Sequence, residues 1–175
     1  MRPPRYLTIT AAVLIIATRT TYADFVNFET PHVHPLDISP DGTTLAACNT
    51  ADNRVELFDQ SGGTPVPLGS VVVGMDPSSA RFYSDTELWV VKQLSDSVSV
   101  VDVANMVVKH TLLTDDEPAD VVFDRSGTPK ALVSCSQTDT IQIFQPDQLA
   151  LAPDTIALEG EEPKALATDG AGSVF

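Results

Sequence analysis

Apolar and polar residues alternate with a period of two along most of the chain, which is the spacing of a β-strand whose two faces meet different surroundings. In residues 97–102, SVSVVD, Val98 and Val100 fall on one face and the serines fall on the other. Residues 140–145, TIQIFQ, repeat the alternation. We find no segment with the three-to-four-residue spacing of an amphipathic helix. The pattern predicts an all-β fold.

Two short patterns recur along the chain at a nearly constant distance. NRVELFD begins at Asn53, DSVSVVD at Asp96 and DTIQIFQ at Asp139, so that successive copies start 43 residues apart. A proline followed by a strand-like run marks four places, at Pro35, Pro77, Pro118 and Pro163. Units of about 40 to 45 residues with four short antiparallel strands are typical of β-propeller blades.

Each unit contains about four strand-like segments, which in the second unit are residues 79–83, 87–92, 97–102 and 107–112. We therefore predict a β-propeller of four-stranded antiparallel blades, with about three and a half blades present. The expected parts of residues 24–175 are an N-terminal strand at 25–28, blade one at 35–73, blade two at 77–113, blade three at 118–159 and a partial blade four at 163–175. This arrangement favours a fragment of a larger closed propeller, with an assembly of several chains or an open array as the alternatives.

The repeat resembles the YVTN-type β-propeller repeat, which is also found in YncE-like secreted proteins. The residues that carry the resemblance are Pro35, Asp41, Gly42, Asn49, Asn53, Val55 and Asp59 in the first unit and Gly74, Pro77, Asp96, Val98, Val100 and Asp102 in the second. The third unit departs from the pattern, because Cys135 stands in place of the Asn and Gln145 in place of the closing Asp. WD40 repeats have a similar length, but no strand here ends in Trp-Asp. The resemblance implies a fold and leaves the function open, since such propellers serve as lactonases, cofactor domains and binding modules.

The first residues of the chain have the pattern of a secretory signal peptide, predicted at 1–23. Arg2 and Arg5 precede an apolar run at 7–17, and Ala23 marks a plausible cleavage point. A membrane anchor is the alternative, but eleven apolar residues are about half of the roughly 20 that span a bilayer. We therefore expect a secreted or periplasmic protein without stable membrane insertion.

The charge and the known catalytic motifs exclude several classes of function. A formal net charge of −14 repels phosphate backbones, so we expect no nucleic-acid partner. The chain contains no G-x-S-x-G elbow, P-loop, Rossmann glycine pattern or calcium-binding loop. No catalytic residue and no cofactor is predicted from motifs, and a divalent metal is the one cofactor left open. Cys48 and Cys135 lie in units that are not neighbours, so we expect no disulfide between them.

Two histidines precede the first repeat proline in the stretch PHVHP, at His32 and His34. In an extended loop the side chains of residues i and i+2 share a face, which makes the two histidines candidate ligands for zinc or copper. At the position of His34 the later units carry acids, and we expect these to form a channel-mouth ligand site of Asp76, Glu117 and Glu162. The alternative is that charged residues before these prolines are only solvated.

The repeat register also predicts which side chains are buried. Val55, Val98 and Ile141 occupy one position in successive units, and we expect each to lie between sheets. Trp89 and Phe123 fall in apolar runs and are expected to pack between blades. His110 is expected at the surface.

We therefore expect an extracytoplasmic β-propeller that acts as a binding or scaffold module through loops at the mouth of its central channel. Its partner would be a protein, a glycan or a small molecule. The alternative is a propeller enzyme, lactonase-like or linked to a metal or redox centre, that uses the ring of histidine and carboxylate side chains.

Overall fold

The computed structural model describes residues 31–175, which form three four-stranded antiparallel sheets and two short 3-10 helices. Sheet one contains β1 (Leu36–Ile38), β2 (Thr44–Asn49), β3 (Arg54–Asp59) and β4 (Val66–Val72). Sheet two contains β5 (Pro77–Ser84), β6 (Glu87–Lys92), β7 (Ser97–Asp102) and β8 (Val107–Leu113). Sheet three contains β9 (Pro118–Asp124), β10 (Lys130–Cys135), β11 (Thr140–Phe144) and β12 (Asp154–Ala157).

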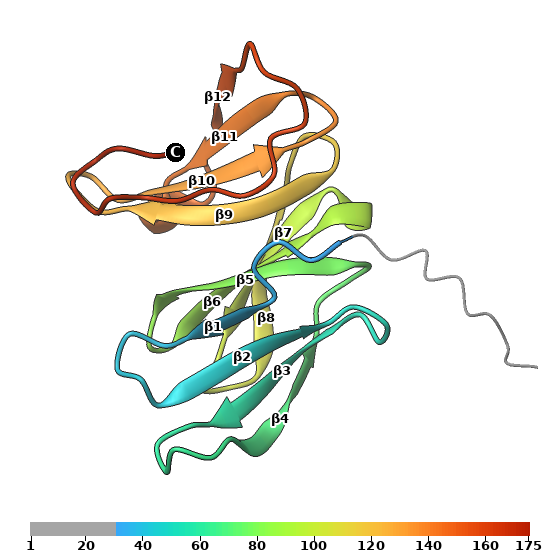
Figure 1. Cartoon of the computed structure of the whole chain (residues 1–175), viewed down its shortest axis with the longest axis vertical. Coiled ribbons are helices and arrows are strands. Elements are labelled where there is room, and N and C mark those ends of the chain that lie inside the picture. The colour runs from blue at the N-terminus through green and yellow to red at the C-terminus, as the bar shows by residue number, and fades with distance from the viewer. Residues whose placement is uncertain (1–30) are drawn as a thin grey trace, which may run out of the picture.

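The strands follow one another in the order in which they pair, so each sheet is a meander. Sheet two lies between the other two (Figure 1). The helices η1 (Gln93–Ser95) and η2 (Pro146–Gln148) are single turns between strands. The all-β prediction, with four-stranded antiparallel blades, is confirmed. The predicted signal peptide and the strand predicted at 25–28 lie outside the described residues.

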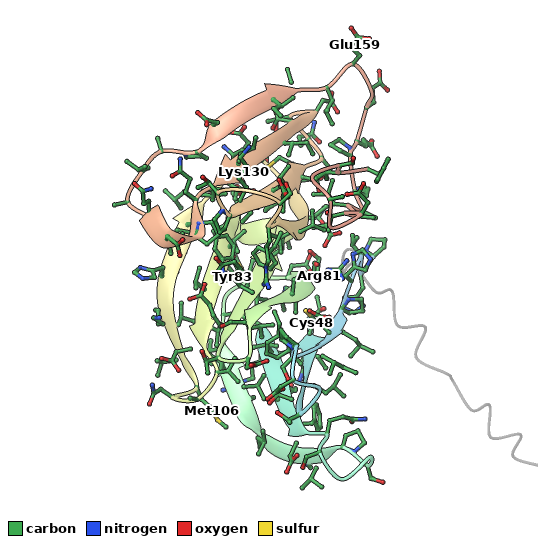
Figure 2. The ribbon with its side chains drawn as sticks, turned by 90° about the vertical axis from the view of Figure 1, so that its left-hand side faces the viewer. Cys48, Arg81, Tyr83, Met106, Lys130 and Glu159 are labelled. Carbon is green, nitrogen blue, oxygen red and sulfur yellow. The ribbon has the colours of Figure 1, made fainter. Side chains whose placement is uncertain are left out.

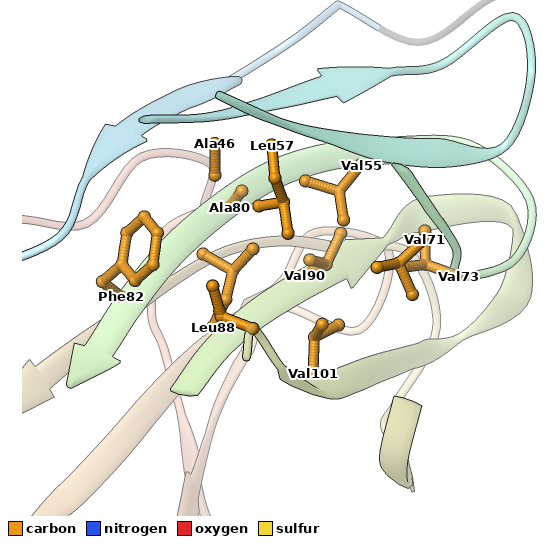
Figure 3. Packing of buried hydrophobic residues seen from close by; sticks show 11 residues of the cluster. Ala46, Val55, Leu57, Val71, Val73, Ala80, Phe82, Leu88, Val90 and Val101 are labelled. Atoms are coloured by element: carbon orange, nitrogen blue, oxygen red, sulfur yellow. The ribbon is translucent and has the colours of Figure 1, made fainter. Parts of the chain in front are cut away.

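Sheets one and two pack through a continuous apolar layer. Val55 and Leu57 from β3 meet Ala80 and Phe82 from β5 and Val90 from β6 (Figure 3). All of these side chains are almost completely buried. Every second residue of a strand points to the same side of its sheet, so the apolar residues at alternate positions form one side of this layer.

Sheets two and three pack through a second layer that contains Trp89, Val98 and Val121. The Trp89 ring meets Phe123 edge-on at 5.5 Å between centroids and Phe144 at 6.4 Å. The expected packing of Trp89 and Phe123 between blades is therefore confirmed. Such aromatic contacts stabilise a core beyond the area that they bury.

All three register positions are buried, and Val55 and Val98 lie between sheets as predicted, whereas Ile141 is covered, among the described residues, by the segment 163–175 and not by another sheet. Val55 lies in the first layer, Val98 in the second, and Ile141 under Leu166 on the far face of sheet three. The segment 163–175 crosses this far face, and its strand pairing consists of a bridge between Thr168 and Val174.

Within residues 31–175, sheet one has one face that no other sheet covers. Leu36, Ile38 and Val72 are about half exposed, whereas Val71 and Val73, which point to the other face, are buried. In a closed propeller this is the kind of face that a neighbouring blade covers. An exposed apolar sheet face of this kind marks an interaction surface.

Both cysteines are free thiols, in agreement with the expected absence of a disulfide between them. Cys48 packs against the layer between sheets one and two, and Cys135 lies in the layer between sheets two and three. Burial raises the pKa of each thiol to about 12, which makes both unreactive at neutral pH. His110 is exposed, as expected. Among residues 31–175 there is no helix of the length and apolarity needed to cross a membrane.

Candidate functional site

The acids before the repeat prolines have an unusual backbone. Asp76, Glu117 and Glu162 adopt positive φ angles of 61°, 52° and 51°. A left-handed backbone is costly for residues other than glycine, so surrounding contacts must hold it. Those contacts come from the preceding blade, at the turn between its second and third strands.

At each of these turns a side-chain oxygen accepts the backbone N–H of the acid that opens the next blade. The three pairs, which we call the blade locks, are Asn53 Oδ1 with Asp76 at 3.1 Å, Asp96 Oδ1 with Glu117 at 3.1 Å and Asp139 Oδ1 with Glu162 at 2.8 Å. The turn residues are left-handed as well. The recurring Asn or Asp of the repeat therefore fixes where the following blade begins.

We expect Asp96→Ala to lower the free energy of unfolding by about 2 kcal/mol. The change removes the hydrogen bond to Glu117 N, and alanine has no side-chain acceptor that could stabilise the left-handed backbone at φ 42°. Asp96→Gly should cost about 1 kcal/mol, since glycine tolerates this backbone. Urea unfolding followed by tryptophan fluorescence measures the series. Asp96→Asn is the control and should stay close to the wild type, because Asn53 fills the equivalent position. An alanine variant as stable as the asparagine variant would show that the lock contributes nothing.

The side chains of the three acids have different surroundings. The Glu117 carboxylate accepts hydrogen bonds from Gln93 Nε2 and Ser136 Oγ, each at 3.3 Å. Asp76 is only 4% exposed, whereas Glu162 is exposed. Within residues 31–175 no three His, Cys, Asp or Glu side chains lie close enough to hold a metal ion. Metal binding by the histidines or by this ring stays a prediction.

The two histidines are held by different blades. The Nε2 atom of His32 makes a close contact with the hydroxyl of Thr50, in the turn that follows β2 of sheet one. The Nδ1 atom of His34 lies 2.7 Å from Asp120 Oδ2 on β9. The backbone at His34 forms a parallel bridge with Ser79 of β5, the first strand of sheet two. From this position the imidazole reaches Asp120 in sheet three.

Asp120 is the centre of this contact. Its side chain is completely buried, and its carboxylate accepts four hydrogen bonds. The donors are His34 Nδ1 at 2.7 Å, Ser79 Oγ at 2.6 Å, Val121 N at 2.9 Å and Leu166 N at 2.8 Å. These donors come from three blade units and from the segment 163–175. A buried carboxylate needs this degree of satisfaction, because an unpaired charge in the interior is very unfavourable.

Arg81 completes the cluster, and we name His34, Ser79, Arg81 and Asp120 the inner-strand site. The Arg81 Nε atom lies 3.8 Å from Asp120 Oδ1. The side chains of His34 and Arg81 are 34% and 25% exposed, so solvent reaches both. Figure 2 shows Arg81 beside the blue segment that begins the described chain.

The sequence prediction included His34 and missed the other three residues. The signal that would have found Asp120 is its repeat position, two residues after the proline, where blade one carries Asp37. The two acids act alike, because Asp37 Oδ2 accepts the Phe82 N–H of the next blade at 2.8 Å, as Asp120 accepts that of Leu166.

The chemistry of the inner-strand site follows from the hydrogen bond of His34. At 2.7 Å from a carboxylate oxygen, Nδ1 carries a proton and donates it. The second ring nitrogen, Nε2, makes no hydrogen bond to the described part of the chain. It is an acceptor when the ring is neutral and a donor when the ring is protonated. The site can therefore accept a proton, hold a metal through one nitrogen, or donate to an anion.

A separate cavity of about 330 Å³ lies at the far face of sheet three. Its lining is apolar and includes Ile141, Ile156 and Phe175. The described residues that line it carry no side chain capable of acid–base chemistry. We therefore place the candidate functional site on the inner strands.

Successive four-stranded antiparallel meanders, packed face to face with their first strands side by side, define this chain as a protein of the β-propeller class. No family model and no curated protein matches it. Solved structures do. Hydrazine synthase from Kuenenia stuttgartiensis, which has β-propeller domains, matches with 24% identity and a TM-score of 0.68 over 83% of this chain and 42% of that chain.

A functionally unknown protein from Desulfotomaculum acetoxidans DSM 771 matches with 19% identity and a TM-score of 0.59, over 69% of this chain and 40% of that one. The chain thus spans less than half the length of these two structures. At these identities the likeness shows the fold alone.

Proposed function

We propose that this protein is an extracytoplasmic β-propeller of the YVTN type that binds a ligand at its inner-strand site. The observation that carries the proposal is the pairing of two partly exposed head groups, His34 and Arg81, with one fully buried carboxylate, Asp120. Head groups held in place before a ligand arrives lose little freedom on binding, which favours affinity.

The location and the repeat type rest on the sequence. The first residues have the pattern of a secretory signal, and the repeat resembles that of YncE-like secreted proteins. Propellers present their loops and inner strands on a rigid scaffold, which suits a binding module. The partner classes that we propose are a protein, a glycan or a small molecule.

A second candidate function is an enzyme in which His34 acts as a general base. The observation that favours it is the hydrogen bond from Nδ1 to a buried carboxylate, which orients the imidazole and leaves Nε2 for a substrate. Ser79 is unsuited to act as its nucleophile, because its hydroxyl donates to Asp120 and not to the imidazole. The enzyme would therefore act on water or on a substrate proton.

Both candidates are tested by nuclear magnetic resonance on the protein labelled with ¹⁵N and ¹³C, titrated with a panel of neutral sugars, amino acids, small carboxylates and zinc. The binding proposal expects shifts that cluster at residues 32–34, 78–81 and 119–121, and that disappear in His34→Ala. Hits that map only to the apolar cavity, or none, would overturn it. Each hit is then incubated for a day, and the enzyme candidate requires a new product that His34→Ala does not form.

A further inference from the structure

The Arg81 guanidinium lies next to a carboxylate to which it makes no hydrogen bond. An ionised carboxylate has about four acceptor positions, and Asp120 fills four with other donors. The buried Nε atom of Arg81 consequently stays 3.8 Å away and has no hydrogen-bond partner in residues 31–175. A guanidinium has five N–H donors in a planar fork, which matches a second carboxylate well.

His34 can supply another donor at the same place. Its Nδ1 is occupied by Asp120 Oδ2, while Arg81 faces the other oxygen of that carboxylate, Oδ1. His34 is therefore hydrogen-bonded to the buried carboxylate, Arg81 lies within ion-pair distance of it, and both side chains reach solvent. A protonated ring would add an Nε2–H donor beside the guanidinium.

The charges at the inner-strand site favour an anion. Arg81 and Asp120 cancel one another, and a protonated His34 leaves one positive charge in a chain whose formal net charge is −14. A ligand with one carboxylate makes the site neutral. A dehydrated cation would instead face a guanidinium at short range, which is unfavourable.

We propose that Arg81 and His34 bind the carboxylate of a small-molecule ligand at the inner-strand site, Arg81 through its guanidinium and His34 through Nε2. This inference rests on the proposed binding function and names its ligand chemistry. The charged groups at the site beside His34 are Asp120 on β9 and Arg81 on β5. Because only the protonated ring donates from Nε2, carboxylate binding strengthens as the solution is made more acidic.

Sodium acetate and sodium succinate are the probes, titrated against sodium chloride at equal ionic strength and followed by the arginine Nε–H and histidine ring resonances. We expect acetate to bind about ten-fold more tightly at pH 6 than at pH 8, because a protonated ring adds a charged hydrogen bond from Nε2 to the carboxylate. Arg81→Gln should weaken acetate binding at least ten-fold. His34→Gln should remove the pH dependence, which a purely structural role would not do.

Arg125→Gln is the matched control, because it removes the same charge from an arginine that stacks on Tyr83, 5.0 Å from its ring centroid. It should change acetate affinity less than two-fold. Amide spectra establish that each variant is folded. Equal effects of the two arginine changes, or acetate shifts no larger than those of chloride, would overturn the inference. If zinc or a neutral sugar bound at the site and acetate did not, the inference that the ligand carries a carboxylate would be wrong. The proposed binding function would still hold.

Discussion

Replacing Asp120 with Ala is expected to lower the free energy of unfolding by about 3 to 5 kcal/mol, because one substitution leaves four donors without their acceptor. The Ser79 hydroxyl and the Leu166 amide are buried, so water does not easily replace the lost carboxylate. Thermal and urea unfolding followed by circular dichroism measure the loss.

The matched control for this change is Asp37→Ala. Asp37 occupies the same repeat position on β1 but accepts, among the described residues, a hydrogen bond from Phe82 N alone. Its replacement should cost about 1 kcal/mol. Asp120→Asn should fall between the two, since the amide keeps one acceptor oxygen and turns its NH₂ toward other donors. If Asp120→Ala cost no more than Asp37→Ala, Asp120 would not be the centre of the network.

The second large effect is expected at Trp89, where replacement by Ala should cost about 3 to 5 kcal/mol. Its side chain is fully buried between sheets two and three, and the indole contacts Phe123 and Phe144. Alanine would leave a cavity that these rings fill only in part. Because this is the only tryptophan in the chain, circular dichroism replaces fluorescence as the measurement.

Two further variants test whether the loss at Trp89 comes from its buried aromatic packing. Trp89→Phe retains part of the aromatic packing and should cost roughly half as much. Leu36→Ala removes an apolar side chain that is 58% exposed on the open face of sheet one, and should cost under about 0.5 kcal/mol. A small loss for Trp89→Ala, comparable to that for Leu36→Ala, would mean that sheets two and three are not held together by this layer.

The strands could be predicted from the sequence because their signal is local. Alternation of apolar residues gives the strand, and the 43-residue spacing of Asn53, Asp96 and Asp139 gives the unit. Val55 and Val98 were placed in the core by the same register, and both are fully buried. Each of these inferences depends on neighbours along one strand or on a fixed period.

The inner-strand site could not be predicted in the same way, because its residues meet through the packing of separate blades. His34 and Asp120 are 86 residues apart, and nothing in the local pattern of either names the other. The spacing of the two histidines also does not reveal their partners, which are Asp120 of sheet three for His34 and Thr50, in the turn after β2, for His32.

The sequence register shows that the acids before the prolines are equivalent, but it does not show that their common role is in the backbone. Sequence register identified Asp76 and Glu117 as equivalent, and it suggested that their carboxylates act together. In the structure their equivalence lies in the backbone, since each has a positive φ and donates its N–H to the preceding blade. Side-chain identity alone does not reveal a backbone role of this kind.

The blade locks bear on how a gene for such a protein can change. Each lock joins a turn residue of one blade to the first acid of the next, as Asn53 joins Asp76 and Asp96 joins Glu117. Inserting or deleting one whole period keeps every donor opposite an acceptor, because any copy can serve its new neighbour. A change of a few residues between Asn53 and Asp76 instead moves one donor away from its acceptor. Unequal recombination in whole periods is therefore the route by which this architecture can lengthen or shorten and still fold.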